Sequence, residues 1–263
     1  MDKKTNKKIL ISGITGNVGK ALLDLISSAD EFELADIAFI GEDEKPDIIE
    51  VDGKPIRLVR PSERDNYISS LKNVMAVDFT TPSAYVDNCN FFIDNDIPFI
   101  IGTTGVTDED IDKIASKIKT SKISAIIDQN MSVELILVSS ALKCLAEKFP
   151  NALKDHAGYG FESHQYGKKD DISGTLIKWG NLIKKLGVDF YMAKGDRTSR
   201  FGHAYHDLTI LNNKGNVRLK LRTEVEGRDT YAQGSLLAIR FLSKMLVKEK
   251  GKVYSMTEVL GSC

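Results

Sequence analysis

The chain has 263 residues, and its 36 basic and 37 acidic residues leave a net charge of -1. A chain of this length favours two domains, and the balanced charge without a basic cluster gives no indication of a nucleic-acid partner. No stretch is apolar for long enough to cross a bilayer, and three scattered cysteines suggest neither a disulfide framework nor a metal site. The basic N-terminal segment precedes an apolar run too short for a signal peptide, so we expect a cytoplasmic protein.

A glycine-rich loop follows the first apolar run. Residues 8–12 predict a strand, residues 21–26 recur at helical spacing, and the loop between them reads G-I-T-G-N-V-G. A strand, a glycine turn and a helix in this order form the usual binding site of a dinucleotide pyrophosphate, although an ordinary strand-to-helix turn can look the same. The loop residues predicted to contact a cofactor are Gly13, Thr15, Gly16, Asn17 and Val18.

An acidic group follows the next predicted strand, residues 34–40. Glu42 lies 42 − 19 = 23 residues beyond Gly19, near the usual place of an acid that holds the adenine ribose hydroxyls. Three acids without an arginine would repel a 2′-phosphate, which slightly favours NADH over NADPH. We expect the polar stretch 45–73 to be irregular, apart from a small hairpin at residues 51–56.

Three further strands alternate with helices in the first half of the chain. The strands are predicted at residues 74–80, 98–101 and 125–127, and the helices at 83–94 and from a Thr107 cap to 118. This alternation predicts a Rossmann-like, doubly wound parallel sheet, in which ligands bind outside the carboxyl ends of the strands. The residues at those ends that we expect to contact the cofactor are Thr80, Gly102, Thr103, Thr104, Gln129, Asn130 and Met131.

The pattern changes after residue 130. An apolar helix is predicted at 132–149, with the following side chains largely buried: Leu135, Leu137, Val138, Ala141 and Leu145. The elements predicted next are a strand at 158–164, a helix at 173–186, and two strands at 203–211 and 217–225 around a hairpin turn at 212–216. They indicate an α+β domain with a mixed or antiparallel sheet.

These elements divide the chain into two predicted domains. Residues 1–130 form the dinucleotide-binding domain, and residues 131–229 form a domain for substrate binding and oligomerisation. The helix at 229–248 and the tail at 253–260 return residues 230–263 to the first domain. Cys89 and Cys144 occur in helical segments and are predicted to lie in the core.

The stretch E-S-H-Q-Y-G-K-K-D-D-I-S-G-T combines three chemical features. His164 can carry a proton near neutral pH, and Lys168 supplies a positive charge four residues later. Ser173, Gly174 and Thr175 stand where a helix begins, which is a favourable site for a carboxylate or phosphate. Singly, each feature is common as a cap, a solvated charge or a paired histidine. Together they predict a site for an anionic substrate that must be protonated.

Two more histidines lie close together on the predicted strand at 203–211. His203 and His206 are three residues apart, so in regular strand geometry they point to opposite faces. We therefore expect them to be structural or interfacial rather than a second pair lining the site.

In these motifs the chain resembles the 4-hydroxy-tetrahydrodipicolinate reductase (dihydrodipicolinate reductase) family over nearly its whole length. The motifs occur at residues 13–19, 77–82 (V-D-F-T-T-P), 101–105 (I-G-T-T-G), 162–175, 227–234 (G-R-D-T-Y-A-Q-G) and 256–260 (M-T-E-V-L). Family members usually carry E-(A/S)-H-H-x-x-K-x-D-x-P-S-G-T, the most specific of these. Here Gln165 and Ile172 replace the second histidine and the proline. The E-S-H-Q variant, with G-H-A-Y-H at 202–206, is more similar to the plant-type branch.

The resemblance implies NAD(P)H-dependent reduction of a cyclic imine dicarboxylate in lysine and diaminopimelate biosynthesis, by a homotetramer. It implies that His164 protonates the ring after hydride transfer and that Lys168 relays the proton or stabilises the anion. Gly102, Thr103 and Thr104 would fix the nicotinamide amide. The implied substrate contacts are Gln165, Ser173, Gly174 and Thr175. Two alternatives stay open, namely another NAD(P)-linked dehydrogenase on the same architecture and a non-catalytic dinucleotide sensor.

Overall fold

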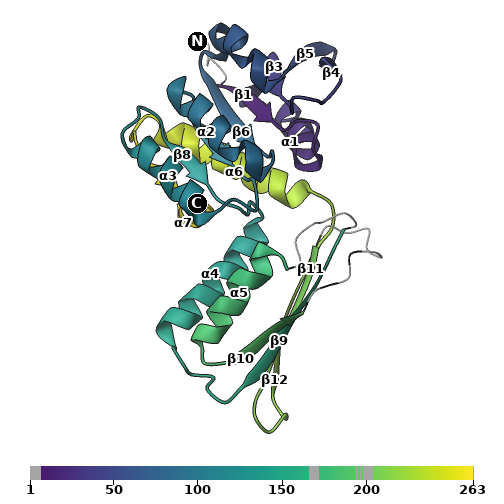
Figure 1. Cartoon of the computed structure of the whole chain (residues 1–263), viewed down its shortest axis with the longest axis vertical. Helices are drawn as coiled ribbons and strands as arrows, with labels where there is room; N and C mark the ends of the chain where they lie inside the picture. The colour runs from purple at the N-terminus through teal and green to yellow at the C-terminus, as the bar shows by residue number, and fades with distance from the viewer. Residues whose placement is uncertain (1–6, 166–171, 194, 196, 198–203, 263) are drawn as a thin grey trace. The chain divides into compact units, whose positions relative to one another are not determined.

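The computed structural model describes residues 7–165, 172–193, 195, 197 and 204–262. The chain forms two compact units, drawn in Figure 1 and described one at a time below. Unit 1 comprises Met1–Ser132 and Asp229–Cys263, and unit 2 comprises Val133–Arg228. Within the described part of the chain, no helix has both the length and the apolar character that a membrane span requires.

Unit 1 is a parallel sheet with helices between its strands. The strands are β1 (Lys7–Ser12), β2 (Phe32–Leu34), β3 (Ile37–Phe39), β4 (Ile48–Val51), β5 (Lys54–Val59), β6 (Val74–Asp78), β7 (Phe99–Ile101), β8 (Ala125–Ile127) and β13 (Val253–Tyr254). The helices are α1 (Asn17–Ser27), α2 (Tyr85–Asp94), α3 (Asp108–Lys119), α6 (Asp229–Met245) and α7 (Met256–Gly261), with 3-10 segments η1 (Pro61–Leu71) and η2 (Pro82–Ala84).

The strand order is β13-β8-β7-β6-β1-β3-β5-β4, with β2 also beside β1. The pairings are parallel except in the β4–β5 hairpin. After β1, the chain forms β3, β4 and β5 on one side of β1. It then crosses over to form β6 on the other side of β1. The predicted doubly wound sheet is therefore confirmed, and its order reverses between β1 and β6, where such sheets bind ligands.

Two predictions in the first half of the chain were wrong. The strand expected at 34–40 is divided into β2 and β3, because the chain bends at Asp36, whose Oδ2 accepts from Lys8 Nζ at 2.6 Å. The stretch 45–73 is not irregular: it contains the predicted hairpin, and β5 also joins the main sheet beside β3. The sequence did not predict β5 as a strand of the main sheet, because exposed residues interrupt its apolar pattern. Its last two residues are nevertheless fully buried.

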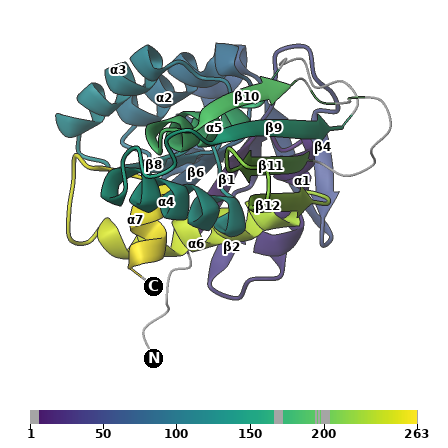
Figure 2. The ribbon, with the colours of Figure 1, turned by 90° about the horizontal axis from the view of Figure 1, so that it is seen from below.

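Unit 2 is a four-stranded sheet covered on one face by two helices. Its elements are α4 (Val133–Lys148), β9 (Ala157–His164), α5 (Gly174–Lys185), β10 (Asp189–Ala193), β11 (Ala204–Leu211) and β12 (Arg218–Val225). The order is β10-β9-β11-β12, as Figure 2 shows, and only the β10–β9 pairing is parallel. The predicted mixed sheet is thus confirmed, although β10 was missed.

The helices pack on the even-numbered side of β9. Gly160 permits close approach there, since a Cβ atom on it would lie 2.7 Å from Leu176 Cδ1. Trp179 of α5 is fully buried, and its indole Nε1 donates to Ser139 Oγ of α4 at 2.8 Å. This hydrogen bond satisfies the polar atom of a large core side chain and joins the two helices.

The expected burial of α4 was wrong on one face. Leu135 is buried, but Leu137 and Leu145 are 56% and 45% exposed, and Ala141 and Cys144 are exposed as well. The helix is apolar on more than one side, so sequence periodicity could not identify the packed side. Cys144 is therefore not a core residue, whereas Cys89 is fully buried as predicted.

We expect the two cysteines to react differently with a thiol reagent. Burial raises the pKa of the Cys89 thiol, so little thiolate forms and reagent cannot reach it. Iodoacetamide at pH 8 should modify Cys144 in the native protein and leave Cys89 unmodified, as read by peptide mass spectrometry. Cys89 labelled as fast as Cys144 would contradict the packing of α2, and full labelling in denaturant is the control.

Candidate functional site

The glycine loop follows β1 at the point where the strand order reverses. Gly13 has φ +83°, and a Cβ atom there would lie 2.6 Å from the Phe79 carbonyl oxygen. A Cβ atom on Gly19 would lie 2.2 Å from the Gly13 carbonyl oxygen. Helix α1 begins after Gly16, which has no side chain to cap it. The first-turn N–H groups at Asn17 and Val18 therefore fit the pyrophosphate of a dinucleotide.

Asp78, at the end of β6, organises the neighbouring strand ends although the motif analysis did not single it out. Its carboxylate is fully buried. Oδ1 accepts hydrogen bonds from the Thr80 backbone N–H at 3.1 Å, the Thr80 hydroxyl at 2.8 Å and the Thr103 hydroxyl at 2.9 Å. Oδ2 accepts from Asn88 Nδ2 at 2.7 Å. One carboxylate thus fixes the residues that follow both β6 and β7.

Arg64 supplies the positive charge that compensates Asp78, and Asn88 is hydrogen-bonded to both side chains. Arg64 of η1 donates to Asn88 Oδ1 at 2.7 Å, and its guanidinium lies over the Phe39 ring, 4.5 Å from the ring centroid. Burial lowers the pKa of the Arg64 guanidinium, and the Asp78 carboxylate acts in the opposite direction. An arginine stays protonated in proteins, so the chain Arg64–Asn88–Asp78 places a positive charge one side chain away from a buried negative charge.

This network limits how the predicted threonines can bind a cofactor. Thr103 is 3% exposed and its hydroxyl already donates to Asp78, so its backbone is what remains for a ligand. Gly102 lies under the Phe79 ring, because a Cβ atom on it would be 2.1 Å from Phe79 Cε1. Thr104 is exposed. The structure therefore brings Gly102 and Thr103 together with Thr80 and Gly13.

The residues predicted after β8 have mainly structural partners. Gln129 Oε1 accepts from the Gly105 N–H at 3.0 Å, and its Nε2 donates to the Val106 carbonyl at 3.1 Å. Asn130 Oδ1 accepts from the Ser132 N–H at 2.9 Å. Met131 is buried. These contacts shape the loops at the edge where the cofactor is expected, and only backbone or unused polar atoms there remain to bind it.

Glu42 accepts its hydrogen bonds from Ser62, which lies outside the glycine loop. Its carboxylate accepts from the backbone N–H of Ser62 at 3.2 Å and from the Ser62 hydroxyl, which lower the pKa of this exposed carboxyl. Glu44, rather than Glu42, accepts a hydrogen bond from the Thr15 hydroxyl. Arg60, distant in sequence, donates to Asp47 Oδ1 at 2.8 Å and to the Glu44 carbonyl at 2.7 Å. An arginine therefore does lie beside the acidic segment.

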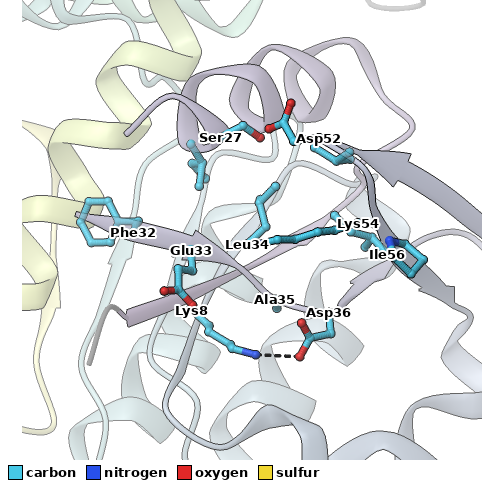
Figure 3. Close-up of a pocket in the computed structure, with 13 residues that line it drawn as sticks. Lys8, Ser27, Phe32, Glu33, Leu34, Ala35, Asp36, Asp52, Lys54 and Ile56 are labelled. Atoms are coloured by element: carbon cyan, nitrogen blue, oxygen red, sulfur yellow. Dashed lines mark hydrogen bonds and ion pairs between the residues drawn. The ribbon is translucent and has the colours of Figure 1, made fainter. Parts of the chain in front are cut away.

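A separate cavity lies at the amino ends of the strands of unit 1 (Figure 3). Figure 3 shows the ion pair between Lys8 and Asp36 among the residues that line the cavity, which also include Phe32, Leu34 and Lys54. None of the residues predicted to contact cofactor or substrate is among the residues that line it. It is therefore distinct from the strand ends where the glycine loop lies.

In unit 2, two of the predicted residues, His164 and Ser173, lie beside Glu162, which is fully buried near the end of β9. Its carboxylate accepts from the Ser173 N–H at 2.8 Å, from the Ser173 hydroxyl and from Arg197 Nη2 at 2.9 Å. His164 lies two residues further along the same face of β9, with Nδ1 3.6 Å from Glu162 Oε1. Glu162 is the first residue of the motif at 162–175, but no role was predicted for it.

Two further described residues belong to this cluster, and neither was predicted as a site residue. Arg197 Nη1 lies 2.8 Å from His164 Nδ1, so the guanidinium contacts both His164 and Glu162. His206 pairs with Glu162 across the β9–β11 ladder, and its ring centroid lies 5.4 Å from that of His164. His206 is buried beside His164, and its expected structural or interfacial role stays a prediction. His203, with which it was compared, lies outside the described residues, as does Lys168.

The start of α5 has both occupied and accessible polar groups. Ser173 is the N-cap, since its hydroxyl accepts from the Leu176 N–H at 3.2 Å while donating to Glu162. Gly174 is exposed and Thr175 is half-buried, so their N–H groups can bind an anion. Gln165 Oε1 accepts a hydrogen bond from Arg228. The arrangement can hold a carboxylate at a helix N-terminus within reach of buried ionisable groups.

We expect removal of the Asp78 carboxylate to destabilise unit 1. Asp78→Ala would leave the hydroxyl of Thr103 and the amide of Asn88 without their acceptor in a buried region. The free energy of unfolding, measured in urea, should fall by about 3 kcal/mol. Asp112→Ala, at an exposed position of α3, should change it by less than about 0.5 kcal/mol. Equal effects of the two variants would disprove the organising role of Asp78.

Comparison with known proteins agrees with this geometry. Two protein-family models match, "Dihydrodipicolinate reductase, N-terminus" over residues 7–131 and "Dihydrodipicolinate reductase, C-terminus" over residues 136–260. The chain is 30% identical over 272 residues to "4-hydroxy-tetrahydrodipicolinate reductase 1, chloroplastic" of Arabidopsis thaliana, covering 96% of this chain and 77% of that protein. It is 27% identical over 275 residues to the 4-hydroxy-tetrahydrodipicolinate reductase of Methanocaldococcus jannaschii, covering 97% of each.

A solved structure shares the fold. The dipicolinate-bound dihydrodipicolinate reductase from Paenisporosarcina sp. TG-14 superposes with a TM-score of 0.69 at 18% identity, covering 95% of this chain and 98% of that one. The family expected from the motifs is thereby confirmed. The glycine loop beside β1, the Glu162–His164 cluster and the two matching family models lead to one conclusion: this chain belongs to the dihydrodipicolinate reductase family.

Proposed function

We propose that this protein reduces 4-hydroxy-tetrahydrodipicolinate to tetrahydrodipicolinate with NADH or NADPH, in lysine and diaminopimelate biosynthesis. The observation that carries the proposal is the cluster in unit 2, where His164 lies beside a buried carboxylate and the accessible start of α5. The relatives named above are called reductases of this substrate, and the structural neighbour is described as binding dipicolinate. A dicarboxylate is therefore the expected class of ligand.

Several of the predicted residues have defined roles under this proposal. The nicotinamide cofactor, when bound, supplies the hydride. The α1 N-terminus and the glycine loop hold its pyrophosphate, and the backbone at Gly102 and Thr103 orients its amide. The backbone at Gly174 and Thr175 binds one substrate carboxylate, and His164 returns a proton to the reduced ring. Lys168 stabilises the anion or relays the proton, and Gln165 makes an additional uncharged contact with the substrate.

The choice of cofactor depends on the segment after β3. Glu42 and Glu44 favour unphosphorylated ribose, whereas Arg60 nearby is a possible partner for a 2′-phosphate. Because Asp47 already pairs with Arg60, we propose that NADH is preferred only slightly. The identities of 30% to the Arabidopsis protein and 27% to the archaeal one differ little, so placement in the plant-type branch stays a prediction, as does a cytoplasmic location.

We also propose that the protein is a homotetramer. The face of the unit 2 sheet opposite the helices exposes Tyr159, Phe161 and Tyr191, a suitable surface for a second copy. Light scattering after size-exclusion chromatography should give four times the mass of the chain. Tyr191→Arg, which places a charge on this surface, should reduce that mass. A wild-type monomer would contradict the proposal.

The function is tested with substrate generated in the assay by a coupled upstream enzyme. Wild-type protein should oxidise NADH or NADPH only when the substrate is present. His164→Ala should lower kcat by roughly 100- to 10,000-fold, the contribution of a general acid. His156→Ala, at a histidine whose ring contacts the Lys154 carbonyl, is the matched control and should leave kcat unchanged.

Binding distinguishes the alternatives. Pyridine-2,6-dicarboxylate should strengthen NADH binding in a fluorescence titration if the protein is this reductase. A dinucleotide sensor would bind NADH without turnover and without response to the dicarboxylate. Activity on an amino acid, with none on the proposed substrate, would favour another dehydrogenase of the same architecture.

A further inference from the structure

We propose that Arg197 is a positioning residue that sets the tautomer of His164, holding its ring neutral with the hydrogen on Nε2. This inference rests on the proposed function only for its catalytic consequence. The structural part concerns the protein without substrate or cofactor. The two terminal nitrogens of the Arg197 guanidinium contact two different partners.

The two contacts of Arg197 form a fork. Nη2 donates to Glu162 Oε1 at 2.9 Å, and Nη1 lies 2.8 Å from His164 Nδ1. Both distances are those of well-formed hydrogen bonds. The side chain of Arg197 is 12% exposed, and those of Glu162 and His164 are 0% and 4% exposed. The fork is therefore shielded from water, where such contacts have their greatest effect.

The chemistry of the fork determines the tautomer. A guanidinium has only donors and keeps its proton in proteins, so His164 Nδ1 must be the acceptor. A neutral imidazole that accepts at Nδ1 carries its hydrogen at Nε2. Adding a proton at Nδ1 would place it against the N–H of Arg197, which opposes that protonation. The hydrogen that His164 presents is therefore the one on Nε2. If the ring gives this proton up, it becomes an imidazolate, whose negative charge the Arg197 guanidinium beside Nδ1 would stabilise until solvent returns a proton to the ring.

The groups around His164 support this assignment. Glu162 faces Nδ1 from the same strand, with Oε1 at 3.6 Å, beyond hydrogen-bond distance. His206 faces it from β11, with its Nδ1 3.1 Å from Thr223 Oγ1 and its Nε2 3.5 Å from Ser173 Oγ. Without Arg197, the Glu162 carboxylate would be the nearest strong acceptor for a hydrogen on Nδ1 among the residues that the structure describes. Arg197 thus separates two groups that would otherwise pair in the opposite tautomer.

A catalytic consequence follows if His164 is the proton donor. An imidazole with its hydrogen on the wrong nitrogen cannot deliver a proton to the substrate, and the effect of a wrong tautomer on turnover is large in other enzymes. Arg197 would then affect kcat more than KM, because it orients the donor without binding the ring that receives the proton. We expect Arg197→Gln to lower kcat by about tenfold, less than the roughly 100- to 10,000-fold loss expected when the general acid itself is removed.

The direct test is nitrogen NMR on the full-length protein labelled with 15N-histidine, at pH 7 and without ligands. The chain has 4 histidines, so signals can be assigned by removing one at a time with His164→Gln and His156→Gln. We expect the wild-type His164 Nδ1 to resonate as an unprotonated ring nitrogen and Nε2 as a protonated one. A protonated Nδ1 in the wild type would overturn the proposal without any variant.

Two variants test the fork itself. In Arg197→Gln the spectrum should move toward a hydrogen on Nδ1, as Glu162 becomes its acceptor. Arg197→Lys retains the charge but lacks the planar fork, so it should hold the Nε2–H tautomer less completely than the wild type. A His164 spectrum unchanged in Arg197→Gln would also overturn the proposal, provided that circular dichroism shows a folded protein.

The readouts separate this proposal from the proposed function. The tautomer is measured without substrate, so the wild-type and Arg197→Gln spectra test Arg197 even if the protein shows no reductase activity. Conversely, reductase activity with a protonated Nδ1 in the wild type would retain the function and reject the role of Arg197. A lower kcat in Arg197→Gln with an unchanged tautomer would likewise reject it.

Discussion

The burial of the Glu162 carboxylate is the constraint on which the geometry of unit 2 depends. A charge removed from water must be compensated by hydrogen bonds and an opposite charge. Glu162 obtains them from Ser173, which begins α5, and from Arg197, which follows β10 in the chain. The same contacts therefore fix the start of a helix and the surroundings of His164. An accessible helix N-terminus and a buried imidazole are held close together by one carboxylate.

Unit 1 uses the same device at a different strand end. Asp78 is also a fully buried carboxylate, and its acceptors hold Thr80 and Thr103 after two adjacent strands. The positive charge near Asp78 is that of Arg64, which is linked to it through Asn88. The positive charge near Glu162 is that of Arg197, which contacts the carboxylate directly. In both units the nearby hydroxyl groups already donate their hydrogen bonds to the buried carboxylate. The backbone, rather than these hydroxyls, is consequently left to bind ligands at Thr103.

Features determined by neighbouring residues could be predicted from the sequence. The glycine turn before α1, the Thr107 and Ser173 caps and the β11–β12 hairpin depend on local conformation, and the structure has all of them. The family resemblance located His164. The place of His206 depends instead on strand register, because pairing with Glu162 puts it on the same face as His164. Register between distant strands leaves no local pattern.

Other features were missed for related physical reasons. Nothing in the sequence distinguishes Asp78 and Glu162 from solvated acids, since their burial depends on partners far along the chain. Arg197 is 35 residues from Glu162 and belongs to no recognised motif. The exposed side of α4 was misjudged because Leu137 and Leu135 are equally apolar. Periodicity identifies a helix with one apolar face, but it cannot select between two such faces.

The guanidinium of Arg197, which contacts both Glu162 and His164, also decides whether this cluster is open to a metal ion. Glu162, His164 and His206 have the side-chain types of a metal site, and their potential ligand atoms lie within 4.8 Å of one another. The guanidinium of Arg197 already bridges Glu162 and His164, so a metal ion would have to displace it. The negative charge of Glu162 and the positive charge of Arg197 cancel when the imidazole of His164 is neutral. If the ring is held neutral as proposed, it carries one hydrogen, on Nε2, and the guanidinium beside Nδ1 would stabilise the anionic ring that remains when this hydrogen is transferred.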